Sequence, residues 1–171
     1  MNTPTPFSTG IKFGLITACI LVIYNATLQM SGLITNSALS FIGLALLIAG
    51  VIMSMRSFKN LNGQLMSYKQ GLSIGTVTAS LAGIIGQLFN YIYVNMIDDS
   101  NAILLMEKQR EKLEKSGIDA QTIEKTMELM KKNTYSPLSI LWGALASILV
   151  GFIISLVIAA VMKKASPEEK I

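Results

Sequence analysis

Uncharged amides are the side chains of this protein that could do chemistry inside its apolar stretches. Asn25 and Gln29 lie in one such stretch, and Gln87 and Asn90 lie on one helical face of another. Amides both donate and accept hydrogen bonds, so these four predict a polar cluster or the lining of a shallow outward-facing cavity. The alternative is that they only join helices, since an interhelical hydrogen bond in a membrane contributes about 0.6 kcal/mol on average.

Other chemistries are poorly represented. The sequence has no histidine and one cysteine, Cys19. Histidine-based acid–base catalysis, histidine-ligated metals and intramolecular disulfides are therefore excluded. The long apolar stretches contain no Asp, Glu, Lys or Arg, which disfavours a proton or ion relay. No nucleophile–base pair stands out, so we expect a protein that is not an enzyme and that holds no cofactor or metal.

The elements that must position the amides are long stretches without charge. Residues 13–55, 70–97 and 133–162 contain no Asp, Glu, Lys or Arg, and only 14% of the chain is charged. Soluble domains average about 25% charged residues, and about 20 apolar residues cross a bilayer as a helix. The sequence predicts one all-α integral membrane domain over residues 1–171. Its four transmembrane helices are expected at about residues 10–31, 37–56, 70–97 and 137–162.

Residues 98–134 differ completely, with eight acidic and seven basic residues. Two helical stripes of apolar residues flank Gly117 and Asp119, which suit a helix C-terminus and an N-cap. The stripes consist of Ile103, Met106 and Leu113, and of Ile123, Met127 and Met130. We expect an extracytoplasmic antiparallel helical hairpin between transmembrane helices 3 and 4. It is either a linker or a docking element for a partner.

Small residues recur every four positions in two of the predicted helices. The candidate helix-packing residues are Gly71, Gly75, Ala79, Gly83, Gly143, Ser147, Gly151 and Ser155. Such ladders let helix backbones approach closely in lipid, either within one molecule or between copies. Each four-residue step turns about 400°, so a ladder drifts about 40° per rung around its helix. We therefore expect the last helix to contact at least two neighbours, because one straight partner could not use every rung.

Positive charge indicates the orientation. The two ends of the chain and the loop between helices 2 and 3 contain seven of the 14 basic residues, against two acids. Short basic loops stay in the cytoplasm, so we expect both termini to be cytoplasmic in a multi-pass protein. The net charge of +4 lies beside the spans, which indicates membrane topology and no nucleic-acid partner.

The arrangement resembles an uncharacterised four-span bacterial membrane family, catalogued as domain of unknown function 4199, over nearly the whole chain. The resemblance rests on Arg56 through Asn62-Gly63, Ser67-Tyr68, Gly71, Gly75, Gln109-Arg110-Glu111, the Gly117 turn, Gln121 through Lys132, Ile158-Ala159-Ala160 and Lys163-Lys164. It implies a protein of the Gram-negative inner membrane. It implies no activity and no functional residues.

The function expected from these observations is non-enzymatic. The protein would scaffold or associate with partners through its spans and its hairpin, and those partners would be the lipid bilayer, a second copy of the chain or another envelope membrane protein. The alternative is a small transporter or channel subunit that uses the uncharged polar residues in the outer leaflet.

Overall fold

A computed structural model gives the structure of residues 5–164, which form six α-helices. They are α1 (Pro6–Met30), α2 (Ser37–Leu61), α3 (Tyr68–Met96), α4 (Ser100–Lys115), α5 (Ala120–Tyr135) and α6 (Leu138–Met162). By length and composition, α1, α2, α3 and α6 could each cross a membrane. The prediction of an all-α fold with four membrane-type helices is confirmed.

Local sequence signals explain where the helices begin and end. Gly32 has a φ of +68° directly after α1, a left-handed conformation that glycine adopts readily. The Asn36 side chain accepts a hydrogen bond from the amide of Ala38 and caps α2. At the start of α3, Ser67 and Gln70 form a capping box, with bonds of 3.3 and 2.8 Å.

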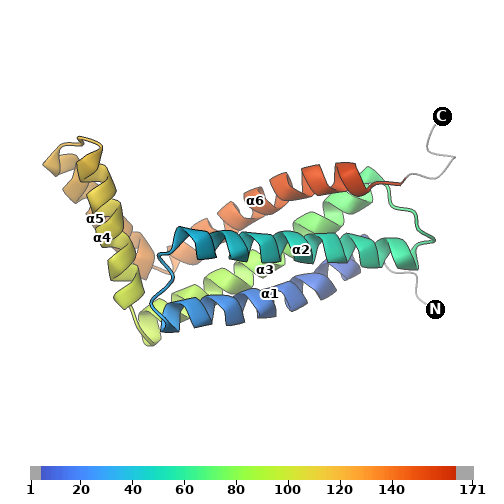
Figure 1. Ribbon diagram of the computed structural model, residues 1–171, viewed down its shortest axis with the longest axis horizontal. Helices are drawn as coiled ribbons and strands as arrows, with labels where there is room; N and C mark the ends of the chain where they lie inside the picture. The colour runs from blue at the N-terminus through green and yellow to red at the C-terminus, as the bar shows by residue number, and fades with distance from the viewer. Residues whose placement is uncertain (1–4, 165–171) are drawn as a thin grey trace.

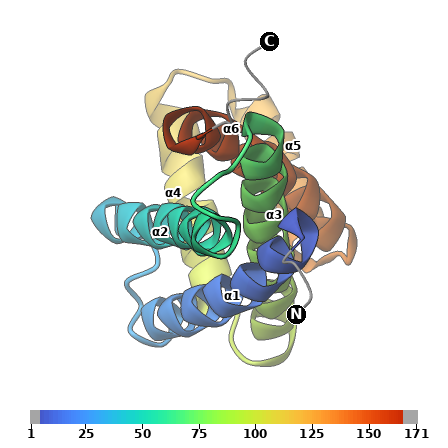
Figure 2. The same cartoon turned by 90° about the vertical axis from the view of Figure 1, so that its right-hand side faces the viewer.

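The four long helices run along the long axis of the molecule (Figure 1). The start of α1, the α2–α3 loop and the end of α6 lie at one end, and the α4–α5 pair lies at the other. Seen along the bundle, α3 lies between α1 and α6, and it makes its most extensive contacts with those two helices (Figure 2). α3 is therefore the helix around which the bundle is assembled.

The tightest part of the bundle lies near the start of α3. Val51, Met55 and Phe58 of α2 pack there with Met66 and Ile74, and all five are at most 1% exposed. Residues 37–49 of α2 include no buried residue. α2 therefore packs through its C-terminal half, which explains why this helix continues to Leu61, beyond the predicted end of the span at residue 56.

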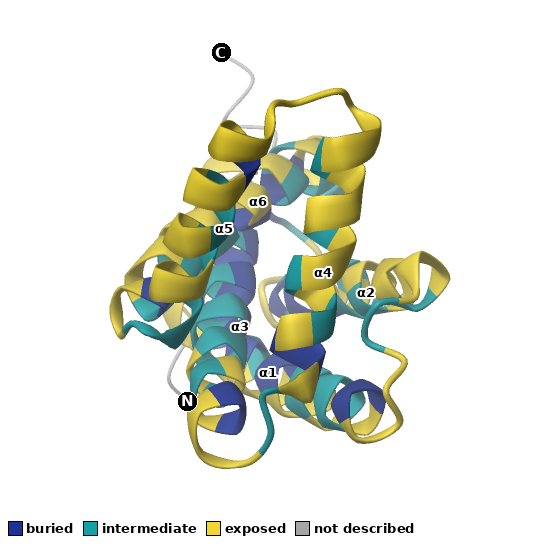
Figure 3. Ribbon diagram, turned by 90° about the vertical axis from the view of Figure 1, so that its left-hand side faces the viewer, coloured by how far each residue is buried: buried dark blue, intermediate teal, exposed yellow. Residues whose placement is uncertain are grey.

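The α4–α5 pair forms a helical hairpin that lies across the far end of the bundle, steeply inclined to its axis (Figure 1). Gly117, with φ +74°, and the capping side chain of Asp119 make the turn at the predicted positions. The hairpin surface is mostly exposed (Figure 3). Ile103 is also exposed, at 44%, because the buried Ala102 takes the inward position at the base of α4. The expected stripe was therefore wrong at Ile103.

Candidate functional site

A cavity of about 240 Å³ lies between the hairpin and the end of the bundle. Five elements line it: α1, the α1–α2 loop, α3, α4 and α5. Its polar lining residues are Gln29, Asn90, Asn101 and Thr134. The remaining lining is apolar and includes Met106 and Met130 from the two facing hairpin helices.

Helix geometry explains how these side chains come together. Gln29 lies in the last turn of α1, just before the Gly32 turn, and Asn101 lies in the first turn of α4. The Asn101 side-chain amide donates to the backbone carbonyl of Gln29 at 2.9 Å. Both residues are almost fully buried, at 5% exposed for Gln29 and 7% for Asn101. This contact joins the base of the hairpin to the end of α1.

A second hydrogen bond closes the base of the hairpin. The Tyr135 hydroxyl at the end of α5 donates to the Asp99 carboxylate before α4, at 2.8 Å. Partial burial, followed by the hydrogen bond to Asp99 and its negative charge, raises the pKa of Tyr135 above its usual value of 10.0. Next to it, Asp98 accepts from the backbone and hydroxyl of Ser100, and these bonds lower the pKa of Asp98. The two ends of the hairpin are thus held side by side.

The four candidate polar residues fall into three places. Gln29 and Asn90 line the same cavity. The Gln87 side chain instead donates to the backbone carbonyl of Ser139 on α6, at 3.3 Å. Asn25 donates to the carbonyl of Leu21 on its own helix, at 2.8 Å. The structure brings together two of the four, and the other two satisfy backbone groups elsewhere.

Sequence reasoning missed Asn101 and Thr134 as cavity residues. Both lie in the charged segment that we expected to form a linker or a docking element, and this hairpin lies across the end of the bundle (Figure 1). The signal available was local: Asn101 and Ala102 are small, uncharged residues that follow Asp98, Asp99 and Ser100.

The eight candidate helix-packing residues all lie at one contact between α3 and α6. Paired across this seam are Gly71 with Ala159, Gly75 with Ser155, Ala79 with Gly151, Gly83 with Ser147, and Gln87 with Gly143. A methyl group added at any of these glycines would meet the opposite residue, so the backbones are as close as the ladders allow.

The seam corrects one expectation. α6 does contact α2 and α5 besides α3, as predicted. The reasoning that one partner could not use every rung was wrong, since all four predicted rungs of α6, and Ala159 one step further, face α3. Both ladders drift around their helices at the same rate, so two helices that wind about each other keep the rungs in contact.

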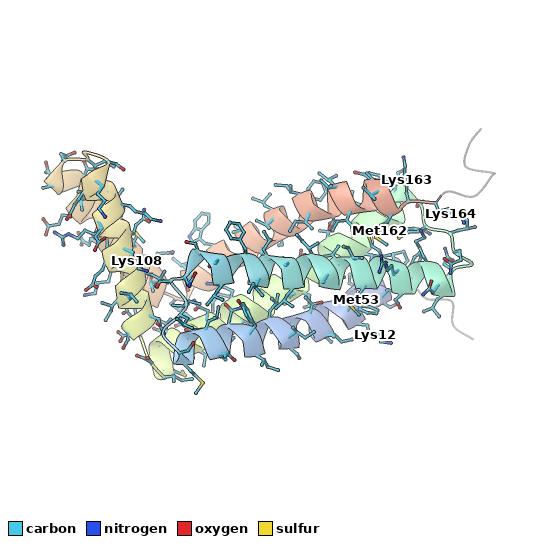
Figure 4. The ribbon with its side chains drawn as sticks, in the orientation of Figure 1. Lys12, Met53, Lys108, Met162, Lys163 and Lys164 are labelled. Atoms are coloured by element: carbon cyan, nitrogen blue, oxygen red, sulfur yellow. The ribbon has the colours of Figure 1, made fainter. Side chains whose placement is uncertain are left out.

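The other end of the bundle is basic. Lys12, Lys163 and Lys164 lie there, at the opposite end from Lys108 of the hairpin (Figure 4). The Lys59 ammonium donates to the carbonyl of Met162 at the end of α6, at 3.0 Å. Met66 and Lys164 also exchange two backbone hydrogen bonds, at 3.0 and 2.9 Å. The α2–α3 loop is therefore tied to the end of α6.

Metal-binding chemistry has little support in residues 5–164. These residues include no group of three or more His, Cys, Asp or Glu side chains that could hold a metal ion. Cys19 is a free thiol on the exposed surface of α1. The cavity under the hairpin is the candidate site, because it brings together two of the predicted amides with Asn101 and Thr134.

Comparison with known proteins gives one match. A family model described as "Protein of unknown function (DUF4199)" matches residues 9–164, which include the seam, the hairpin and the cavity. No curated protein and no solved structure matches the chain.

Proposed function

We propose a role from the geometry of the chain itself, because the chain belongs to the family described as Protein of unknown function (DUF4199), and that description gives no activity. The chain is a non-enzymatic scaffold of the bacterial inner membrane. Its four-helix bundle anchors it in the bilayer, and its hairpin binds a partner protein of the envelope.

The observation that supports this role is that the hairpin is unnecessary as a connection. Asp99 and Tyr135, at its two ends, are hydrogen-bonded at 2.8 Å. Helix–helix connections in bundles usually need about two to eight residues. The chain instead forms two helices of 16 residues each, which extend about 24 Å away from this point and back. A segment that returns to its own base adds surface, and a docking element needs surface.

That surface has apolar side chains among its charges. Leu129 on α5 is 68% exposed and Ile103 on α4 is 44% exposed. The base of the hairpin is fastened by the Asn101–Gln29 and Tyr135–Asp99 contacts. A surface held in one orientation loses less conformational entropy when it binds a partner.

The proposed orientation puts the basic end in the cytoplasm and the hairpin outside it. Lys12, Lys163 and Lys164 lie together at the basic end (Figure 4). The positive-inside rule assigns the end with more basic residues to the cytoplasm. A reporter enzyme that works only in the cytoplasm should be active when it is fused after Lys163. Activity of a periplasmic reporter at this position would contradict the orientation.

Transport through the protomer is the weaker alternative. The cavity is a polar site at the hairpin end, as a transporter would need. Toward the basic end, however, the bundle is filled by apolar side chains such as Met55, Phe58 and Ile74, each at most 1% exposed. A polar solute would have to displace this core, which favours the scaffold role.

The test is site-specific photo-crosslinking in native membranes. A photo-crosslinking residue at Leu129 should give a discrete adduct with another envelope protein, and one at Lys112, an exposed position on α4, should give much less. Replacing residues 100–133 with a short Gly/Ser linker should leave a folded, membrane-inserted bundle that has lost its partners. If Leu129 gives no adduct, or if the linker variant keeps every partner, the scaffold role of the hairpin is wrong.

A further inference from the structure

We infer that the cavity between the hairpin and the end of the bundle binds a small uncharged molecule with an amide or hydroxyl group and a short apolar body. This site does not depend on the scaffold role, because it lies between the hairpin and the bundle and not on the outer surface of the hairpin.

The inference rests mainly on the unbonded side-chain amide of Gln29. It is only 5% exposed and lines the cavity. Its backbone carbonyl accepts from Asn101, but its side-chain amide has no hydrogen-bond partner among the described residues. Its amide nitrogen and oxygen are not sealed from solvent, unlike the unpartnered hydroxyls of Thr76 and Ser80, so they open into the cavity that Gln29 lines. A molecule inside the cavity would supply the missing bonds.

Further polar groups converge on the same space. Asn101 uses its amide nitrogen to bond Gln29, which leaves its side-chain oxygen available as an acceptor. Asn90 of α3 and Thr134 of α5 line the cavity from two other helices. Together these groups present both donors and acceptors, which suits an amide or a hydroxyl.

The rest of the lining indicates the charge and the size of the ligand. It includes no Asp, Glu, Lys or Arg, so an ionic ligand would lose its hydration without gaining an opposite charge. Met106 and Met130 offer flexible apolar surface to a hydrocarbon group. The volume of about 240 Å³ lies below the roughly 300–1,000 Å³ typical of pockets for drug-sized ligands, so the ligand is small.

The test uses the full chain in proteoliposomes with hexanamide as the probe. Cys19→Ser removes the native thiol, and Ala102→Cys puts a reporter thiol on the cavity wall, at a position that is only 7% exposed. The rate at which a water-soluble thiol reagent modifies this cysteine is measured with and without probe. At about twice Kd, bound hexanamide should slow modification about threefold, because the unoccupied fraction falls as 1/(1 + [L]/Kd). Hexanoate and hexylammonium, charged molecules of equal chain length, should leave the rate unchanged.

Two variants and one matched control locate the effect. Gln29→Leu should abolish protection by hexanamide. Asn90→Leu should weaken it, and this exposed position tolerates the change if Gln29→Leu fails to fold. Asn25→Leu changes an amide one turn earlier in α1 that bonds its own helix, so it should keep full protection. Equal protection by all three probes, or full protection in both cavity variants, would overturn the inference.

Discussion

A single methyl group at Gly151 tests the close contact between α3 and α6. A Cβ atom added to Gly151 would lie 2.6 Å from the Cβ of Ala79. Non-bonded carbons prefer about 3.5–4.0 Å, so α3 and α6 would have to separate by roughly 1 Å at this rung. No rotamer change can relieve the contact, because both atoms are attached directly to a backbone.

The size of the effect follows from two opposing terms. Overpacking of this kind costs about 1–3 kcal/mol. Glycine to alanine within a helix returns about 0.5–1 kcal/mol, because the alanine chain has less freedom when unfolded. We therefore expect Gly151→Ala to lower the free energy of unfolding by about 1 kcal/mol, and by no more than about 2.5 kcal/mol. Gly151→Leu should lower the free energy of unfolding further, because its larger side chain requires α3 and α6 to separate more.

The assay is reversible unfolding of the purified protein in mixed micelles, followed by helical circular dichroism. Gly86→Ala is the matched control, since a methyl group on that glycine of α3 would have no neighbour within 4 Å. This control should be as stable as the wild type or more stable. The double variant Ala79→Gly/Gly151→Ala moves the methyl group across the seam and should recover about 1 kcal/mol of stability.

Three results would refute this reasoning. If Gly151→Ala unfolds like the wild type, the helices are not in close contact there. If Gly86→Ala loses as much stability as Gly151→Ala, the effect is general to glycine. If the effect of the double variant equals the sum of its single variants, Gly151 and Ala79 do not face each other.

Three further predictions concern the hairpin and the basic end. Asp119 caps α5, and the hydrogen bond that it accepts from Thr122 lowers its pKa below the usual 3.8. The ionised cap therefore stabilises α5 fully above pH 3.8. This stabilisation is lost as the pH falls through the lowered pKa. Hydrogen exchange in the first turn of α5 should therefore quicken in acid, and Asp119→Asn, which caps without titrating, should remove this pH dependence. Tyr135→Phe removes the 2.8 Å bond to the Asp99 carboxylate and should speed hydrogen exchange at the base of the hairpin, at a cost of about 1 kcal/mol. Lys59→Met removes the bond to the Met162 carbonyl at the end of α6 and should lower the free energy of unfolding by about 1 kcal/mol in the same micelle assay, whereas Lys59→Arg should retain most of it.

The helices themselves could be predicted from the sequence because their signals are local. Gly32 after α1, the Asn36 cap of α2 and the Ser67–Gln70 capping box each act within a few residues. The charge-free stretches likewise identify membrane-type helices without reference to any other part of the chain. The hairpin turn at Gly117 belongs to the same class of signal.

The partner of each helix face could be predicted only in part. The small-residue ladders indicate which faces pack closely, but a ladder does not specify its partner. Only the structure pairs Gly75 with Ser155 and Ala79 with Gly151, because that pairing depends on how two helices wind about each other.

The sequence by itself determined the helices, their ends and the faces that pack closely, because capping, hydropathy and residue size are properties of neighbouring residues. The tertiary structure decided which amides meet. It placed Gln29 and Asn90 on one cavity with Asn101, while Gln87 bonds the backbone of α6. These amides meet because the hairpin lies across the end of the bundle. That position depends on contacts between distant residues, such as Asn101 and Gln29, which are 72 residues apart in the chain.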